Sequence, residues 1–147
     1  MYRRVFGRID FAAYVEQWKR SKYRYFETIY FASHGRPGRL TLGKESIELL
    51  EIAELLKGAC RGKTLMFGGC CTLDVPKGDI GRLLSATGAR AVVGYVRSPD
   101  WVESTVMDLL FLENLRHSES PEKASAWLKK NCSGMLRRYG FRVHLGG

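Results

Sequence analysis

The chain lacks the features that would place it in a membrane, among disulfide-rich proteins or among metalloproteins. None of its apolar runs approaches the roughly 20 residues that span a bilayer, and its start has no apolar block typical of a signal peptide. We therefore expect a cytoplasmic protein with no membrane partner. The four cysteines include no CxxC pair and the three histidines have no metal-ligand spacing. These patterns predict reduced thiols and no metal site.

Acidic residues are scarce relative to basic ones. The sequence has 15 Asp and Glu against 24 Lys and Arg, which gives a net charge of +9. Such an excess is compatible with binding to nucleic acid or docking on an acidic protein. However, the basic residues are spread along the chain, with no long basic block and no nucleic-acid-binding motif. The sequence therefore favours a solvated basic surface, and nucleic-acid binding is the weaker alternative.

Length and hydrophobic patterning indicate one α/β domain covering residues 1–147. The apolar runs 26–32, 64–67 and 89–96 predict buried strands, because continuous apolar runs are typical of central parallel strands. Helices are predicted between and after them, and a hairpin is predicted at 40–42 and 47–49, with an edge strand at 141–145. The expected helices are one capped by Asp10, one over 50–56, one capped by Asp79, one opened by the capping-box pattern of residues 100–103, and one opened by Ser120-Pro121. Alternating strands and helices predict a mainly parallel sheet.

The long helix after residue 100 has apolar residues at helical spacing. We expect its buried stripe to consist of Val102, Thr105, Val106, Leu109, Leu112 and Leu115.

Two short motifs follow two of the predicted strands. Ser33-His34-Gly35 comes directly after the first strand, and the segment 68–72, Gly-Gly-Cys-Cys-Thr, comes directly after the second. If the two strands are parallel neighbours, His34 and Cys70 emerge at the same edge of the sheet. A cysteine nucleophile and its imidazole partner require this arrangement.

The chemistry of these residues suits acyl transfer. His34 would take the proton of the Cys70 thiol, since the thiolate is the nucleophilic form. The backbone N–H groups of Gly35 and Cys70 would stabilise an oxyanion. The structural alternative is that His34 is a hydrogen-bonded residue at a strand end and that Cys70 packs as a small apolar side chain.

With these motifs, the segment Thr87-Gly88-Ala89-Arg90-Ala91-Val92-Val93 resembles the caspase-like cysteine peptidases, specifically the short bacterial CHAT type related to caspases and separases. The resemblance implies a three-layer sandwich with a mainly parallel central sheet flanked by helices. It implies a His34–Cys70 dyad, an oxyanion hole at Gly35 and Cys70, and hydrolysis of a protein or peptide substrate through a thioester without metal or organic cofactor. It also implies a setting in bacterial stress or antiviral defence.

The resemblance further implies that Asp100, with Glu103 close by, binds a basic substrate side chain. The alternative is that these two residues serve only as the capping box of the following helix. Cys71 departs from the family pattern after the nucleophile. The chain is also short for this fold, so we expect a sheet edge covered by a partner or another subunit. The remaining alternatives are an inactive caspase-like interaction domain, which binds a regulatory protein or forms a homo-oligomer, and a basic nucleic-acid-binding module.

Overall fold

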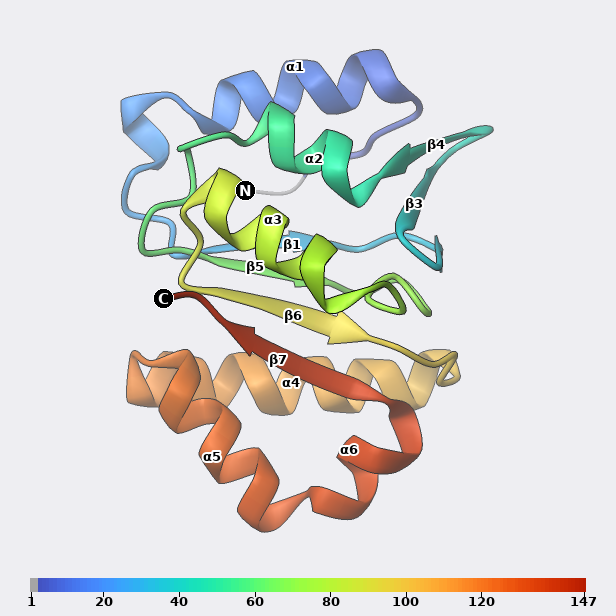
Figure 1. Ribbon diagram of the computed structural model, residues 1–147, viewed down its shortest axis with the longest axis vertical. Coiled ribbons are helices and arrows are strands. Elements are labelled where there is room, and N and C mark those ends of the chain that lie inside the picture. The colour runs from blue at the N-terminus through green and yellow to red at the C-terminus, as the bar shows by residue number, and fades with distance from the viewer. Residues whose placement is uncertain (1–2) are drawn as a thin grey trace.

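The computed structural model describes residues 3–147, so the first two residues of the predicted domain 1–147 lie outside the described part of the chain. A mixed β-sheet lies between helices, and a small second sheet lies beside it (Figure 1). The helices are α1 (Arg8–Trp18), α2 (Leu49–Leu55), α3 (Lys77–Thr87), α4 (Trp101–Ser118), α5 (Pro121–Asn131) and α6 (Ser133–Tyr139), with a short 3-10 helix η1 (Ser21–Tyr23). The strands are β1 (Thr28–Phe31), β2 (Gly35–Arg36), β3 (Arg39–Leu42), β4 (Glu45–Glu48), β5 (Thr64–Phe67), β6 (Ala91–Tyr95) and β7 (Phe141–Leu145).

The main sheet has the strand order β1-β5-β6-β7. Strands β1, β5 and β6 are parallel, whereas β7 runs antiparallel to β6. The predicted α/β class and mostly parallel sheet are therefore confirmed. The second sheet is the antiparallel set β2-β3-β4, which includes the predicted hairpin. Within residues 3–147, no helix is both long and apolar enough to cross a membrane.

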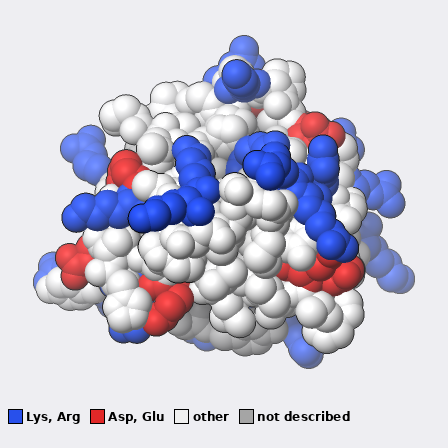
Figure 2. Space-filling model, turned by 90° about the horizontal axis from the view of Figure 1, so that it is seen from below, with Lys and Arg blue, Asp and Glu red and all other residues white. Residues whose placement is uncertain are grey.

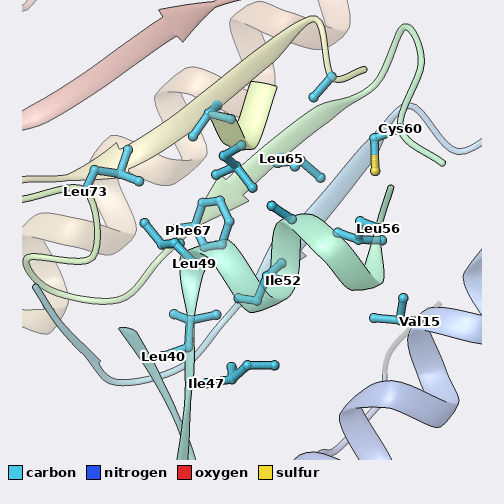
Figure 3. Close-up of a cluster of buried hydrophobic side chains, with 14 of the residues drawn as sticks. Val15, Leu40, Ile47, Leu49, Ile52, Leu56, Cys60, Leu65, Phe67 and Leu73 are labelled. Carbon is cyan, nitrogen blue, oxygen red and sulfur yellow. The ribbon is translucent and has the colours of Figure 1, made fainter. Parts of the chain in front are cut away.

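Two hydrophobic cores lie on opposite faces of the main sheet. On β5, the alternating residues Leu65 and Phe67 belong to the core formed with α1, α2 and α3, whereas Met66 belongs to the core formed with α4, α5 and β7. This alternation follows from the two-residue period of a strand. Figure 3 shows the first core, where Ile52 of α2 lies close to Phe67. Each face of the sheet is thus covered by helices.

Two predicted helix caps are wrong. Helix α1 begins at Arg8, with Gly7 as its N-cap, and Asp10 lies in the first turn, where its carboxylate accepts a hydrogen bond from the Phe6 N–H at 3.1 Å. Helix α3 begins at Lys77, so Asp79 also lies in the first turn rather than at the cap. Both carboxylates remain near a helix N-terminus, where the helix dipole favours negative charge. That shared preference explains why sequence alone misplaced the caps by a few residues.

The predicted buried stripe of α4 is wrong except at its end. The buried residues are Met107, Asp108, Phe111 and Leu115. Of the predicted stripe, Val102, Thr105, Val106 and Leu109 are exposed. The helix carries apolar residues on two faces, and packing against α5 and the sheet selects one of them. The buried face also brings Asp108 into reach of two tyrosines in the sheet, which a purely apolar pattern does not predict.

Candidate functional site

The candidate site lies at the carboxyl end of the parallel strands. Phe31, Phe67 and Gly94 are aligned across β1, β5 and β6, so the loops that follow these strands leave the sheet side by side. The loop after β5 is fixed to both neighbours. Its Gly68 N–H donates to the Phe31 carbonyl at 3.0 Å, and its Leu73 N–H donates to the Tyr95 carbonyl at 2.9 Å.

The loops after β1 and β5 touch through their backbones. A Cβ atom on Gly35 would lie 2.5 Å from the Cys70 carbonyl oxygen and would overlap the hydroxyl of Thr72. A Cβ atom on Gly69 would lie 3.0 Å from both the Cα and the N of Gly35. The contact at Gly35 is shorter than real Cβ atoms make, and the contact at Gly69 is tighter than nearly all of them, so a side chain at either position would push the two loops apart. The contact brings the backbones of the two loops together next to His34 and Cys70.

His34 is held by its backbone rather than by its ring. Its carbonyl oxygen accepts a hydrogen bond from the Thr41 N–H at 2.8 Å, and the Ser33 hydroxyl donates to the Thr41 carbonyl. Both bonds attach the loop to β3. The His34 side chain is exposed, and within residues 3–147 its ring has no hydrogen-bond partner. The imidazole is therefore accessible to a thiol or to a bound molecule.

The two adjacent cysteines contact the loop that follows β6. The half-buried Cys70 thiol donates to the Pro99 carbonyl at a sulfur–oxygen distance of 3.7 Å. Cys71 has a positive φ of 54°, and its sulfur lies 3.2 Å from the Ser98 hydroxyl. The Cys71 N–H also donates to the Arg97 carbonyl at 2.9 Å. In the part of the chain that the structure describes, no group of three or more His, Cys, Asp or Glu side chains could hold a metal ion.

The two predicted oxyanion donors have no partner in the surrounding loops. Gly35 lies opposite Leu40 in the β2–β3 pair. Because the His34 carbonyl is bonded to the Thr41 N–H, this is a non-hydrogen-bonded pair of the antiparallel ladder, and the Gly35 N–H points away from β3. The Cys70 N–H donates to no acceptor within residues 3–147. Neither N–H group therefore has a hydrogen-bond acceptor among residues 3–147.

Asp100 and Glu103 form a complete capping box at the start of α4. The Asp100 carboxylate accepts from the Glu103 N–H at 2.8 Å, and the Glu103 carboxylate accepts from the Asp100 N–H at 3.2 Å. Glu103 also pairs with Arg138 at 3.1 Å. The structural role expected for the pair is therefore present. Asp100 is exposed and directly follows Pro99, which places it beside the Cys70 contact.

Sequence reasoning missed a buried polar cluster beneath the site. The Tyr30 hydroxyl donates to one oxygen of Asp108 at 2.5 Å, and the Tyr95 hydroxyl donates to the other at 2.7 Å. Burial raises the pKa of the Asp108 carboxyl, although the two tyrosine hydrogen bonds oppose this shift. Burial, together with the Asp108 charge, raises the pKa of Tyr95, and Cys70 contributes to the same increase. The available signal was a single carboxylate within the apolar run of the long helix.

Basic residues are more concentrated in space than along the sequence. Figure 2 shows Lys and Arg gathered in a band across the face seen from below, which Figure 1 places on the side of α4, α5 and α6. Residues 120–147 carry six Lys or Arg and a single acidic residue, Glu122. The basic residues of this segment, all exposed, are Lys123, Lys129, Lys130, Arg137, Arg138 and Arg142. We call these six residues the basic face.

Comparison with known families places the chain among proteins without an assigned activity. A family model described as a family of unknown function (DUF6642) matches residues 10–145. The chain belongs to the DUF6642 family. The match includes both motifs of the candidate site and every strand of the main sheet. No curated protein matches the chain. Membership in DUF6642 therefore assigns no reaction, and function must be argued from the site itself.

Proposed function

We propose that this DUF6642 protein is a caspase-like cysteine peptidase in which Cys70 attacks the substrate and His34 transfers protons. The observation that supports the proposal is the backbone contact between Gly35 and Gly69, because His34 and Cys70 adjoin these two glycines in the sequence. The resemblance to CHAT-type peptidases in the same motifs supports it. A cytoplasmic location would suit the reaction, because a reducing compartment keeps Cys70 as a thiol.

The reaction needs only groups that this chain supplies. His34 takes the thiol proton of Cys70, and the thiolate attacks the scissile carbonyl carbon. The N–H groups of Gly35 and Cys70 stabilise the negative oxygen that forms. The C–N bond then breaks, and His34 returns its proton to the leaving amine. Water hydrolyses the remaining thioester, which releases the acid and restores the Cys70 thiol. No metal or organic cofactor takes part in this scheme.

Asp100 is our candidate for selecting the substrate. Its exposed carboxylate lies next to Pro99, whose carbonyl contacts the Cys70 thiol, so a basic side chain before the cleaved bond would meet a negative charge there. Asp100→Asn is the sharp test, because Asn is also a good N-cap and keeps the start of α4 intact. We expect this variant to lose the preference for Arg and Lys while it remains folded. An unchanged preference would restrict Asp100 to its capping role.

A peptide-library cleavage assay tests the proposal directly. We expect the wild-type protein to cleave, and the Cys70→Ala and His34→Ala variants to lose cleavage. Cys71→Ala is the matched control, because it removes the neighbouring thiol and should leave cleavage in place. Loss of cleavage only in Cys71→Ala would reassign the nucleophile. Folded wild-type protein without any cleavage would favour the alternative of a non-catalytic interaction domain.

Thiol alkylation gives a second, independent readout, and Cys60 is its internal control. Cys60 is fully buried, and burial raises the pKa of its thiol to about 12. It should therefore stay unmodified by iodoacetamide near pH 8 in the folded protein. We expect mass spectrometry to locate rapid modification at Cys70 and to show that His34→Ala slows it. Equal rates at Cys70 in both proteins would remove His34 from the dyad.

The basic face favours a second candidate function, binding to the phosphate backbone of nucleic acid. Five of its six basic residues belong to α5 and α6, which cover the face of the sheet opposite to α1, α2 and α3, and the sixth, Arg142, is on β7. One acidic residue accompanies them in the sequence. Binding of this kind falls steeply with salt concentration, because each phosphate contact releases counterions. A charge-reversed pair, Lys129→Glu with Lys130→Glu, should abolish it. Salt-insensitive or absent binding to DNA and RNA would eliminate this candidate.

A further inference from the structure

The main sheet ends at β1, and the outer edge of this strand is unpaired. Strand β1 is the first in the order β1-β5-β6-β7, and no strand within residues 3–147 pairs with its other side. It carries the sequence Thr-Ile-Tyr-Phe, which is rich in β-branched and aromatic residues. Exposed edges of this kind are templates for pairing with another chain.

The hydrogen bonds to β5 show which peptide groups face outward. The Thr64 N–H donates to the Glu27 carbonyl, and the Gly68 N–H donates to the Phe31 carbonyl. In a parallel ladder, this register uses the peptide groups of residues 27, 29 and 31 toward β5. The N–H and C=O groups of Thr28, Tyr30 and Ala32 therefore point to the free edge. Among residues 3–147, no hydrogen bond outside the strand ladder satisfies them.

A groove follows this edge. A cavity of about 700 Å³ is lined by β1, by Leu40 and Leu42 of β3, and by Arg3 and Arg4 of the N-terminal segment. A second cavity of about 190 Å³ continues along the strand beside α1 and shares Tyr30 and Phe31 with the first. The groove thus combines apolar walls, a row of unpaired peptide groups and two arginines. These are the elements that recognise an extended peptide by strand addition.

We propose that this groove binds an extended acidic segment of a partner protein, which joins the main sheet as a strand beside β1. Main-chain hydrogen bonds to Thr28, Tyr30 and Ala32 hold the segment. Its alternate side chains pack on the apolar walls, and its carboxylates meet Arg3 and Arg4. Apolar and acidic residues should therefore alternate in the ligand, since successive side chains of a strand face opposite sides.

The positive charge of the chain favours an acidic peptide over a second copy of the chain as the occupant of the groove. Each copy carries a net charge of +9, so pairing two β1 edges would bring like charges and both arginine pairs together. An acidic segment gains from the same charges. The proposal is independent of the peptidase reaction, because its contacts involve the strand edge and leave the roles of Cys70 and His34 open.

The test uses a fluorescent peptide of alternating Glu and Val, six residues long and blocked at both ends. Fluorescence anisotropy measures its binding, and a Lys-Val peptide of the same length is the charge control. Two N-methylated forms carry the methyl groups on all Val or on all Glu nitrogens. We expect one form to lose binding and the other to keep it, because only alternate N–H groups of an added strand face β1. Hydrogen exchange should show new protection at the amides of Thr28, Tyr30 and Ala32.

Matched charge reversals complete the test. Arg4→Glu should weaken binding about 2- to 5-fold, the range for an exposed ion pair. Arg137→Glu makes the same charge change on α6, away from the groove, and should leave binding unchanged. Equal losses in both variants, or in both N-methylated forms, would show non-specific charge attraction and overturn the proposal. Protection of the same amides that rises with protein concentration in the absence of peptide would identify a second copy as the occupant and also overturn it.

Discussion

The Tyr95 hydroxyl donates a 2.7 Å hydrogen bond to the Asp108 carboxylate, and this bond joins the last residue of β6 to the buried face of α4. Tyr30 approaches the same carboxylate from β1, so one side chain of α4 connects two strands of the sheet. The Tyr30 ring also lies against the Cys70 loop, since a Cβ atom on Gly68 would be 2.6 Å from its hydroxyl oxygen. The cluster therefore supports the loop that carries the candidate nucleophile.

Asp108→Ala should destabilise the protein by about 2–4 kcal/mol, because it removes two hydrogen bonds to a charged group and leaves the buried Tyr95 hydroxyl with fewer partners. Urea unfolding followed by circular dichroism measures the loss. Tyr30→Phe is the comparison. It should cost only about 0.5–1.5 kcal/mol, because Tyr30 is 44% exposed and water can replace its hydroxyl. Equal losses in the two variants would contradict this account of the cluster.

The strands were easier to predict than the orientation of α4. Continuous apolar runs predicted the bounds of β5 and β6 to within two residues. Strands that are buried on both faces have apolar residues at nearly every position, so the run itself marks the strand. In α4, apolar residues occupy two faces, and the buried one contains Asp108. The choice depends on tertiary contacts with Tyr30 and Tyr95, which lie 78 and 13 residues away in the sequence. Local spacing carries no information about those contacts.

A pair of alanine substitutions on α4 tests which face is buried. Phe111 is fully buried, so Phe111→Ala should cost about 3–5 kcal/mol through the lost contacts and the cavity. Leu109 is 62% exposed, so Leu109→Ala should change stability by less than about 0.5 kcal/mol. Chemical denaturation of both variants provides the measurement. A large loss at Leu109 would restore the stripe predicted from the sequence, or would indicate a partner on that face.

His144 should make the protein less stable as the pH falls. Burial lowers the pKa of this side chain, with further contributions from Arg142 and Lys77, and its Nε2 atom is buried without a hydrogen-bond partner among residues 3–147. The unfolded chain therefore takes up a proton first, near pH 6.5, and stability falls as the pH drops below that value. Urea midpoints at pH 7.5 and 5.5 measure the slope. His144→Gln should flatten it, and an unchanged slope would assign the effect to other groups.

In the candidate site, as in the fold, some features could be predicted from the sequence and others could not. His34 and Cys70 were predicted as neighbours because parallel strands deliver their following residues to one edge, and that topology could be inferred from the alternation of elements. The direction of the Gly35 N–H, which points away from β3, could not be inferred, because it depends on the register of β2 against β3. The two-residue strand β2 was not predicted from the sequence.

Gly35→Ala should damage both stability and activity, because the new methyl group would meet the Cys70 carbonyl oxygen at 2.5 Å. Relief requires the two loops to separate, at a cost of about 1–3 kcal/mol. Separation would also displace His34 from Cys70, and a displacement near 1 Å reduces catalysis about 10²-fold. Peptide cleavage and urea unfolding measure the two effects.

Gly81→Ala on α3 is the matched control, since nothing lies within 4 Å of its Cβ position. It should stabilise the helix by about 0.5–1 kcal/mol and leave cleavage unchanged. Full activity in Gly35→Ala would show that contact between the two loops is not needed for the reaction.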